Sequence, residues 1–443
     1  CVALCGDGYD MATSSTKAQY DTIIIGGGPA GLIAAITAAR EGSKVLLLEK
    51  NATLGKKLRI SGGGRCNITN NTENVRTLLS RYGEAGKFLF SPFAQFGVKE
   101  TRQWFRDIGV ETVVEAEARV FPVSQSAEAV TEALIATAKA AGVTIKTKQT
   151  VMGLKKMTKG ITVLLESADI CFAPRVIVST GGLSRPETGS TGDAFAWLAT
   201  LGHTIDTPKA ALVPVAVKES ETTKRLSGVS LATAGISLRQ AGLVFHKTKG
   251  KVLFTHVGLS GPGILNLSYR VGEGLATGGV EILLDFTPAT AKDALEELLL
   301  ARFMAAPNKH LQNQWAEIIP GALVVPVLEQ AGIDPHTPSH SVTVLQRQQL
   351  VATLKGYVLT ASHLLGIDKA VVTSGGVTLT EIDFRTMESR IVPGLYVVGD
   401  VLNINRPSGG YGLQLAWTTG YVAGCQVAHH AGVQESSNND SQK

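Results

Sequence analysis

The sequence predicts an α/β protein, in which a Rossmann-like dinucleotide-binding domain carries an inserted β-barrel and an inserted helical subdomain. Three observations predict this class. A strand, a Gly-rich turn, a helix and a second strand follow one another over residues 20–50. Short alternating strands replace this pattern over residues 209–288, and helical periodicity dominates residues 289–365. The chain of 443 residues is also too long for a single core.

The first of these units carries a nucleotide-binding fingerprint. The apolar run 20–25 leads into a turn in which Gly26, Gly28 and Gly31 fit the pattern G-x-G-x-x-G. The first glycine permits a tight turn, the second lets the backbone approach a pyrophosphate, and the third allows close packing of helix and strand. The second strand ends on Glu49, whose carboxylate can accept the ribose hydroxyls. Because an acid disfavours a 2′-phosphate, FAD or NAD fits this turn better than NADP.

Further helices and strands continue the dinucleotide-binding domain. We expect helices over 32–40, 75–109 and 127–141, and strands over 45–48, 143–148, 161–166 and 175–179. These elements fall in the first segment of a discontinuous domain, 20–208, whose second segment is 366–430 and holds strands over 370–373 and 394–400 and a helix over 413–428. Residues 1–19 are predicted to form a tail. The terminal segment 431–443 is rich in Ser, Asn, Asp and Gln and is predicted to be disordered.

Two inserts separate these segments. Strands expected over 212–217, 230–238, 252–255 and 280–286 indicate a small barrel at 209–288, which residues near 340–365 could complete. The following segment, 289–365, is mainly helical and is interrupted by several prolines.

Composition restricts the partners. The net charge of +5 is spread along the chain without a basic tract, so we expect a small-molecule substrate and no nucleic-acid partner. No apolar run is long enough to span a membrane, so we do not expect a membrane as a partner. The five cysteines lack metal-ligand spacing, which predicts no metal site and a reducing, cytoplasmic location.

The cofactor choice depends on the second half of the chain. A predicted strand ends in Gly399-Asp400, and a carboxylate there can hold a ribityl hydroxyl of FAD. A Gly-rich turn at 407–412 precedes the last helix, whose N-terminus would stabilise negative charge at the pyrimidine edge of a reduced flavin. No second fingerprint is present for NAD. The sequence therefore favours FAD, with NAD(P)H left open as a transient electron donor.

Five separated motifs make the prediction specific. They are residues 61–67 (SGGGRCN), 180–193 (TGGLSRPETGSTGD), 253–263 (LFTHVGLSGPG), 372–377 (VTSGGV) and 386–400 (TMESRIVPGLYVVGD). Together the motifs resemble the YhiN-like FAD-dependent flavoprotein family, which includes aminoacetone oxidase and BaiN-type proteins. The resemblance spans residues 20–428 and implies an FAD-binding Rossmann-like domain with a β-barrel insert and a helical insert.

The chain departs from the family pattern at one place. The family usually shows GE-x-LD followed by GGYN, whereas this sequence has Asp400, Asn403 and Gly412 at the corresponding positions. Asp400 keeps a carboxylate with a shorter reach. Asn403 and Gly412 lose a charge and an amide, so contacts with the substrate or the flavin edge are expected to differ there.

The resemblance and the fingerprint together predict the site. The expected cofactor-contacting residues are Gly26, Gly28, Pro29, Ala30, Gly31, Glu49, Lys50, Lys57, Gly64, Arg65, Cys66, Asn67, Val151, Thr180, Gly181, Gly182, Gly399, Asp400, Gly410, Gly412 and Leu413. His256 is the candidate general acid/base, with a hydrogen-bonded core histidine as the alternative, and Tyr411 is a second catalytic candidate. For the Cys66 thiol, a structural role is favoured over a redox role.

We therefore expect an FAD-dependent oxidoreductase that exchanges a hydride between flavin N5 and a small organic substrate. An oxidase acting on an amine or a related compound is slightly favoured, because the chain lacks a second dinucleotide fingerprint. An NAD(P)H-dependent reductase or dehydrogenase is the main alternative. A flavin-dependent RNA-modifying enzyme and a non-catalytic flavoprotein rank below it.

Overall fold

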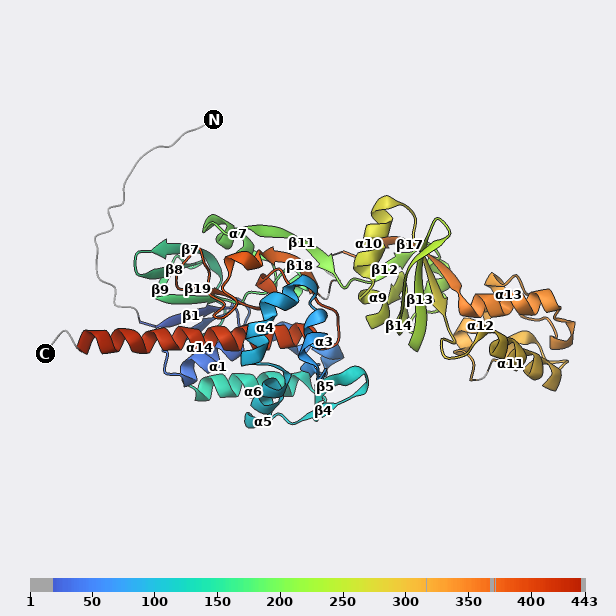
Figure 1. Cartoon of the computed structure of the whole chain (residues 1–443), viewed down its shortest axis with the longest axis horizontal. Coiled ribbons are helices and arrows are strands. Elements are labelled where there is room, and N and C mark those ends of the chain that lie inside the picture. The colour runs from blue at the N-terminus through green and yellow to red at the C-terminus, as the bar shows by residue number, and fades with distance from the viewer. Residues whose placement is uncertain (1–18, 316, 367–369, 371, 440–443) are drawn as a thin grey trace, which may run out of the picture.

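The computed structural model describes residues 19–315, 317–366, 370 and 372–439. Figure 1 shows an elongated molecule with a Rossmann-like domain at one end, a barrel in the middle and a helical subdomain at the other end. Except for residue 19, the predicted N-terminal tail lies outside the described residues.

A parallel sheet forms the centre of the Rossmann-like domain. Its strands, in spatial order, are β19 (Leu395–Val397), β10 (Arg175–Val178), β1 (Thr22–Ile25), β2 (Val45–Leu48) and β6 (Thr144–Lys146). Runs of Val, Ile and Leu build β1 and β2, and every residue of both strands is buried, as a parallel sheet covered on both faces requires. The carboxyl ends of β1, β2 and β10 therefore share one edge of the sheet.

Two long helices lie side by side beside this sheet. These are α1 (Pro29–Arg40) and α14 (Tyr411–Asn439). Gly420 and Gly424 of α14 allow the close approach, because a Cβ atom would stand 2.4 Å from Ala30 O or 2.7 Å from Ala34 O of α1. Helices α1 and α14, which are far apart in the sequence, therefore pack against each other in one core.

Smaller elements surround the sheet. They comprise the antiparallel strands β7 (Val151–Met157), β8 (Gly160–Leu165) and β9 (Ile170–Ala173), a second small sheet of β3 (Thr69–Asn70), β5 (Arg119–Pro122) and β4 (Thr112–Val114), and the helices α2 (Lys56–Arg59), α3 (Val75–Ser80), α4 (Gly86–Gln95), α5 (Val98–Asp107), α6 (Ala127–Ala140) and α7 (Asp193–Thr200). The 3-10 turns are η1 (Ser61–Gly64), η2 (Gly83–Ala85), η3 (Ala116–Ala118), η4 (Pro186–Thr188), η5 (Leu311–Asn313), η6 (Ser339–Ser341), η8 (Leu379–Glu381) and η9 (Gly399–Val401).

The insert contains a closed antiparallel barrel. Around the barrel the strands are β12 (Val215–Val217), β15 (Gly258–Ser260), β14 (Leu243–Thr255), β13 (Ser230–Gln240), β16 (Glu281–Asp285) and β17 (Tyr357–Leu364). The helices α8 (Ser220–Arg225), α9 (Pro262–Leu265) and α10 (Ser268–Thr277) lie between these strands in the sequence. Strand β17 closes the barrel after the whole helical segment has intervened.

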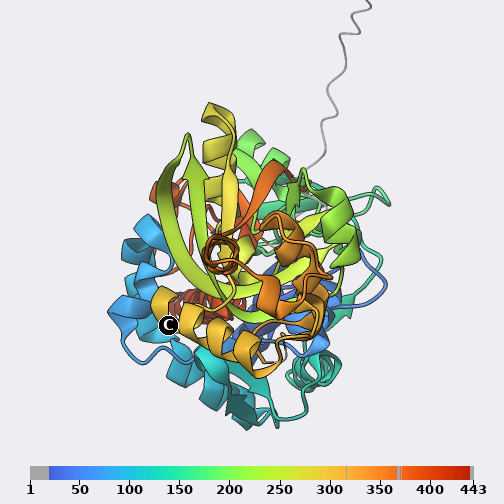
Figure 2. The ribbon, with the colours of Figure 1, turned by 90° about the vertical axis from the view of Figure 1, so that its right-hand side faces the viewer.

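Among the described residues, the far subdomain contains the helices α11 (Lys292–Ala305), α12 (Gly321–Gln330) and α13 (Val344–Lys355). Figure 2 looks along the long axis and shows these helices in front of the barrel. Buried residues of the helices and the barrel make one hydrophobic core, which is separate from the core of the Rossmann-like domain.

A two-stranded ribbon joins the insert to the Rossmann-like domain. Strand β11 (Ile205–Ala211) pairs antiparallel with β18 (Val372–Val377), and Ala211 lies opposite Val372. The chain therefore leaves the domain and returns to it side by side.

The C-terminal helix differs from the sequence expectation. We expected it over 413–428 with a disordered tail from 431, but α14 begins at Tyr411 and continues to Asn439. An established helix adds each further residue at little cost, so weak helix formers at its end can still be helical. Residues 440–443 lie outside the described part of the chain.

Candidate cofactor and substrate site

A cavity of about 820 Å³ lies between the carboxyl edge of the parallel sheet and the barrel. This volume is within the range of cofactor and ligand pockets. The predicted cofactor residues that line it are Gly26, Gly28, Pro29, Ala30, Glu49, Lys50, Lys57, Arg65, Asn67, Val151, Thr180, Gly181, Gly399, Asp400, Gly410, Gly412 and Leu413. The fold thus brings together residues from both segments of the Rossmann-like domain.

The glycines of the fingerprint have the geometry that a dinucleotide needs. Gly26 has φ +106°, a backbone conformation that favours glycine. A Cβ atom on Gly28 would meet nothing within 4 Å, so this residue leaves open space on the cavity wall. A Cβ atom on Gly31 would lie 1.9 Å from Gly26 O. Gly31 therefore serves helix packing and does not line the cavity.

Glu49 is fixed at the adenosine end of the cavity. Its Oε2 accepts a hydrogen bond from Gly27 N at 2.8 Å, and its Oε1 accepts from Asn51 N at 2.8 Å and Asn51 Nδ2 at 2.7 Å. Nearby, Lys50 Nζ forms an ion pair with Asp193 Oδ2 at 2.6 Å. These bonds preorganise a carboxylate at the end of β2, where a ribose is expected.

A cluster of charges lies deeper in the cavity. Asp400 accepts a hydrogen bond from Arg406 Nη2, and its Oδ2 lies 3.4 Å from Lys57 Nζ. Burial alone would raise the pKa of the Asp400 carboxyl, but the charges of Arg406 and Lys57 outweigh burial and hold this pKa below its usual range. Burial lowers the pKa of Lys57, and Asp400 opposes that shift. Asp400 is therefore a carboxylate held between two cations.

One donor of this cluster has no partner. Arg406 Nη1 donates to Ile404 O at 2.8 Å, while Arg406 Nε is buried without a hydrogen-bond partner in the described structure. Gly412 makes room for this guanidinium, since a Cβ atom there would stand 3.2 Å from Arg406 Nε. The open wall at Gly28, the fixed carboxylate of Glu49 and this unpaired donor fit the oxygen-rich chain of FAD.

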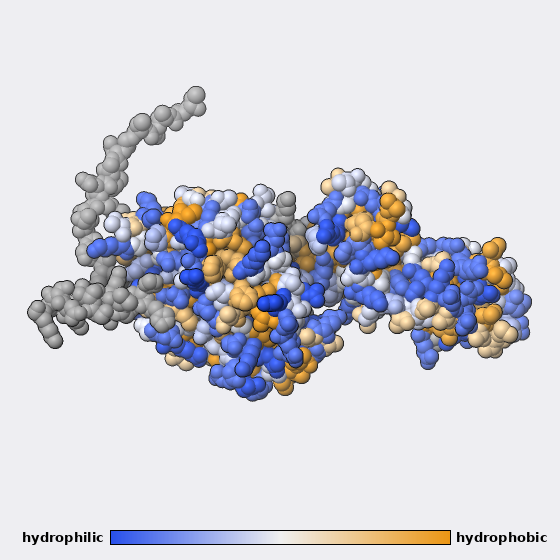
Figure 3. Space-filling model, in the orientation of Figure 1, coloured by the Kyte–Doolittle hydropathy of each residue, from blue (hydrophilic) through white to orange (hydrophobic). Residues whose placement is uncertain are grey.

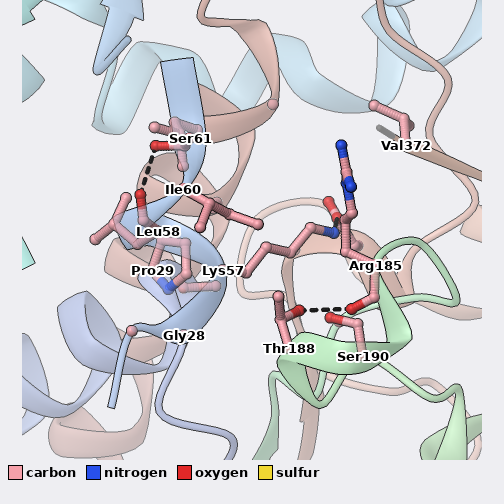
Figure 4. A pocket seen from close by; sticks show the side chains of 18 of the residues that line it. Gly28, Pro29, Lys57, Leu58, Ile60, Ser61, Arg185, Thr188, Ser190 and Val372 are labelled. Carbon is pink, nitrogen blue, oxygen red and sulfur yellow. Dashed lines mark hydrogen bonds and ion pairs between the residues drawn. The ribbon is translucent and has the colours of Figure 1, made fainter. Parts of the chain in front are cut away.

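Figure 4 shows the middle of the cavity. Lys57 extends across it toward Arg185, whose side chain points toward Val372. Lys57 Nζ also donates to Ser184 Oγ at 2.7 Å. Arg185 has φ +59°, a strained backbone for a residue with a side chain. It lines the cavity and lies within the motif at 180–193, but it was not among the expected cofactor-contacting residues.

The two loops expected near the flavin lie together. With the Asn67 amide oriented to satisfy both of its ends, its oxygen accepts from Gly410 N at 3.0 Å and its nitrogen donates to Thr69 O at 3.0 Å. The Arg65 guanidinium lies 4.0 Å from the centre of the Phe121 ring and forms an ion pair with Glu115. Asn67 therefore joins the two loops, and Arg65 is held against the cavity wall.

The barrel supplies the opposite wall. Lys251, Leu253, Leu265 and Asn266 line the cavity from this side. Asn266 was not predicted from the sequence, because its role depends on a contact with a distant loop, at Ser408.

Four predicted cofactor residues lie off the cavity wall: Gly31, Gly64, Cys66 and Gly182. Gly64 is exposed and has φ +85°, a backbone conformation that favours glycine. A Cβ atom on Gly182 would stand 2.5 Å from Thr373 Oγ1, so a glycine is needed there for close packing. Cys66 is 0% exposed, and burial raises the pKa of its thiol to about 12. The Cys66 side chain therefore does not line the cavity, and its burial agrees with a structural thiol.

Neither predicted catalytic residue lines the cavity. His256 is exposed in the turn between β14 and β15, so its side chain is not buried in the site. Tyr411 is 7% exposed and packs edge-to-face against Tyr82, whose hydroxyl donates to Tyr411 O at 2.9 Å. The His256 side chain thus faces solvent and the Tyr411 side chain belongs to the core, and both catalytic assignments stay predictions.

The described residues contain no group of three or more His, Cys, Asp or Glu side chains placed to hold a metal ion. No helix among them has both the length and the apolar character needed to cross a membrane.

Comparison with known proteins gives matches along almost the whole chain. The family described as HI0933-like protein Rossmann domain matches residues 20–426. The 3-dehydro-bile acid delta(4,6)-reductase of Clostridium scindens is 32% identical over 408 residues, which cover 91% of this chain and 98% of that protein. The ribosomal RNA dihydrouridine synthase of Escherichia coli is 31% identical over 415 residues, which cover 91% of this chain and 97% of that protein.

Solved structures show the same fold at lower identity. The 3-ketosteroid delta1-dehydrogenase from Sterolibacterium denitrificans has a TM-score of 0.53 and 14% identity, covering 93% of this chain and 99% of that one. The family predicted from the motifs is therefore confirmed. Together with the FAD-fitting cavity, these matches identify the chain as an FAD-dependent oxidoreductase that belongs to the HI0933-like family.

Proposed function

We propose that this enzyme reduces a carbon–carbon double bond conjugated to a carbonyl group. The observation that carries the proposal is the shared chemistry of two relatives that align over nearly their full lengths. The name of one describes reduction of a Δ4,6 double-bond system in a 3-oxo compound. The name of the other describes saturation of uracil, whose 5,6 double bond is conjugated to a carbonyl. Their substrates differ in size, but the type of bond reduced is the same.

Several features of the cavity support this proposal. FAD, when bound, supplies hydride chemistry at N5. Glu49 would hold the ribose of the adenosine half, and Gly28 would let the backbone approach the pyrophosphate. Asp400 and Arg406 would hold the ribityl part. The N-terminus of α14 would favour negative charge at the flavin edge.

Apolar side chains line the barrel side of the same cavity. Leu253 and Leu265 of the insert lie there with Val372 of the connecting ribbon. Apolar walls exclude water from a reacting carbon centre and strengthen the electrostatic interactions inside the site. We therefore assign the substrate-binding wall to the insert and the cofactor-binding wall to the Rossmann-like domain.

The test is a single turnover of the photoreduced enzyme without oxygen. We expect 2-cyclohexenone or a 3-oxo-Δ4 steroid to reoxidise the flavin and to gain two hydrogens, as measured by absorbance and mass spectrometry. Cyclohexanone is the matched control and should leave the flavin reduced, because it has no conjugated double bond. Reoxidation at the same rate with both ketones would overturn the proposal.

A second experiment addresses the oxidase that the sequence slightly favoured. The absence of a second fingerprint supports an oxidase, whereas the names of the relatives support the reductase alternative. Oxidised enzyme is mixed without oxygen with aminoacetone, NADH or NADPH. Flavin bleaching by a nicotinamide and none by the amine is expected for the reductase. Bleaching by the amine alone would favour the oxidase.

A further inference from the structure

Arg185 presents a guanidinium group on the wall of the cavity that no hydrogen bond to another described residue holds. Its ion-pair partner is Glu187, whose Oε1 lies 3.7 Å from Arg185 Nη1. This distance is too long for a hydrogen bond. Both side chains are partly exposed, and an ion pair of this kind contributes little to stability. The N–H donors of Arg185 are therefore available to a ligand.

Two other cations in the middle of the cavity share a carboxylate that Arg185 does not reach. Asp400 accepts a hydrogen bond from Arg406, and its Oδ2 lies 3.4 Å from Lys57 Nζ. Lys57 extends across the cavity toward Arg185 (Figure 4). Burial chiefly lowers the pKa of Lys57, and the nearby charge of Arg185 adds to that shift. The cluster thus carries a surplus of positive charge, and Arg185 is its least neutralised member.

The backbone around Arg185 is fixed in a conformation that residues with a side chain rarely adopt. Arg185 has φ +59° and ψ +59°, and its carbonyl accepts hydrogen bonds from Thr188 N at 2.9 Å and Thr188 Oγ1 at 2.7 Å. One residue earlier, Ser184 N donates to Thr373 Oγ1 at 3.0 Å. Thr373 belongs to β18, directly after Val372. These bonds fix the point from which the Arg185 side chain extends, and strain held in this way clusters at functional sites.

The Arg185 side chain lies where the two walls of the cavity meet. It points toward Val372, which lines the cavity together with Leu253 and Leu265 of the insert (Figure 4). Charged and polar side chains are ordinary on the outer face of the barrel, where Figure 3 shows mainly hydrophilic residues. A guanidinium beside the apolar side chains of a cavity is different, because a ligand that displaces water from it must supply a hydrogen-bond acceptor. The acceptor is expected on the substrate side of the cavity.

We propose that Arg185 binds the carbonyl oxygen of the substrate and stabilises the negative charge that this oxygen acquires during reduction. The proposal rests on the proposed function, in which reduced FAD supplies the hydride. Addition of the hydride to the β-carbon forms a C–H bond and breaks the carbon–carbon π bond, so an electron pair moves to the carbonyl oxygen. The α-carbon then takes a proton from water and the carbonyl group forms again. Arg185 keeps its own proton throughout, and its N–H groups lower the barrier because they already face the developing charge.

The test compares Arg185→Gln with Glu187→Gln in the FAD-loaded enzyme. The first variant removes the guanidinium and the second removes only its ion-pair partner, so a purely structural ion pair would make the two variants alike. Arg185→Lys is the conservative variant, which keeps the charge without the planar fork. The probe is 4-cyanophenolate, a stable oxyanion on a flat ring, and its binding is measured from the flavin absorbance at mildly alkaline pH. The uncharged 4-cyanoanisole is the matched control ligand.

We expect Arg185→Gln to bind 4-cyanophenolate about tenfold more weakly than the wild type, because a hydrogen bond to a charged group is lost. Glu187→Gln should bind it as well as the wild type, Arg185→Lys should recover part of the affinity, and all four proteins should bind 4-cyanoanisole alike. Equal phenolate affinity of Arg185→Gln and the wild type, or no phenolate binding by the wild type, would overturn the proposal. Loss of FAD from Arg185→Gln would also overturn it, because Arg185 would then belong to the cofactor wall.

Reduction of 2-cyclohexenone by the photoreduced enzyme is measured on the same samples. Arg185→Gln should lower the limiting rate by about 100-fold. The half-saturating enone concentration should change little, because the interaction strengthens only in the transition state. Glu187→Gln should react at the wild-type rate. Loss of enone reduction by the wild type would refute the proposed function, while phenolate binding would still show whether Arg185 holds an oxyanion. Equal limiting rates for the wild type and Arg185→Gln would refute the role of Arg185 alone.

Discussion

Asn266, directly after helix α9 of the insert, accepts two hydrogen bonds from Ser408 of the Rossmann-like domain. Its Oδ1 lies 2.9 Å from Ser408 N and 3.1 Å from Ser408 Oγ. Ser408 stands in the Gly-rich turn before α14, so this contact joins the insert side of the cavity directly to the turn expected at the flavin edge.

Replacing Asn266 by Ala should impair turnover more than cofactor binding. Two hydrogen bonds of about 1 kcal/mol each are lost, so kcat/KM for an enone should fall by about tenfold or more while FAD content is kept. Ser408→Ala is the graded control, because its backbone N–H still donates to Asn266 and a smaller loss is expected. Equal activity of both variants and the wild type would show that the contact does not position the barrel.

Gly28→Val should separate cofactor binding from folding. A side chain fits the protein there, with φ −82° and no atom within 4 Å, but it would occupy the cavity wall where the pyrophosphate is expected. Gly279→Val is the matched control at an exposed position with equal space. We expect unchanged circular dichroism for both variants and FAD loss for Gly28→Val alone, measured as cofactor released by acid.

Asp400→Asn should destabilise the protein by about 3 kcal/mol, because Lys57 and Arg406 would lose their buried counter-charge. The pKa of Asp400 is depressed in the fold, so its contribution is present above the unfolded pKa of about 3.9 and is lost as pH falls through the folded value. Urea denaturation across acidic pH measures both effects.

The Asp400→Asn variant should therefore lack part of the acid-induced fall in stability seen in the wild type. Asp293→Asn, at an exposed position of α11, is the control and should follow the wild-type profile. A parallel acid profile for Asp400→Asn and the wild type would contradict the charge arrangement described for the cavity.

Cys66 should be inert in the folded protein. Burial raises the pKa of its thiol to about 12, so the reactive thiolate is nearly absent at pH 8 and the sulfur is also inaccessible. Iodoacetamide followed by peptide mass spectrometry should leave Cys66 unmodified until denaturant is added. Rapid labelling of Cys66 in the native, FAD-loaded enzyme would refute this.

His256→Ala should retain FAD and enone turnover to within about twofold, as expected for an exposed side chain away from the cavity. The pH profile of kcat/KM should also be unchanged. A lost ionisation in that profile would restore His256 as an acid/base candidate.

The fingerprint could be predicted because its information is local. The strand, the glycines and Glu49 lie within one short segment, and the structure places Gly26, Gly28 and Glu49 on a single cavity. The barrel was also expected, since strands alternating in polarity have a recognisable period. Its closure by β17 depends on a pairing across the entire helical segment.

The contacts deeper in the cavity could not be predicted in the same way. Arg406 donates a hydrogen bond to Asp400 and occupies the space that Gly412 leaves open. Asn266 accepts a hydrogen bond from Ser408. No sequence pattern predicts these contacts. The exposure of His256 could not be predicted, because a motif gives the position of a residue in the chain but not the direction in which a turn presents it.

The pairing of Ala211 with Val372 has a consequence for how such enzymes diversify. Neighbouring strands are about 4.8 Å apart, so a short turn could join the two positions if everything between them were removed. The flavin-binding half is complete on the near side of that junction, and the barrel and helices form a cassette on the far side. Exchanging the cassette would therefore exchange one wall of the cavity while the nucleotide-binding half stayed unchanged.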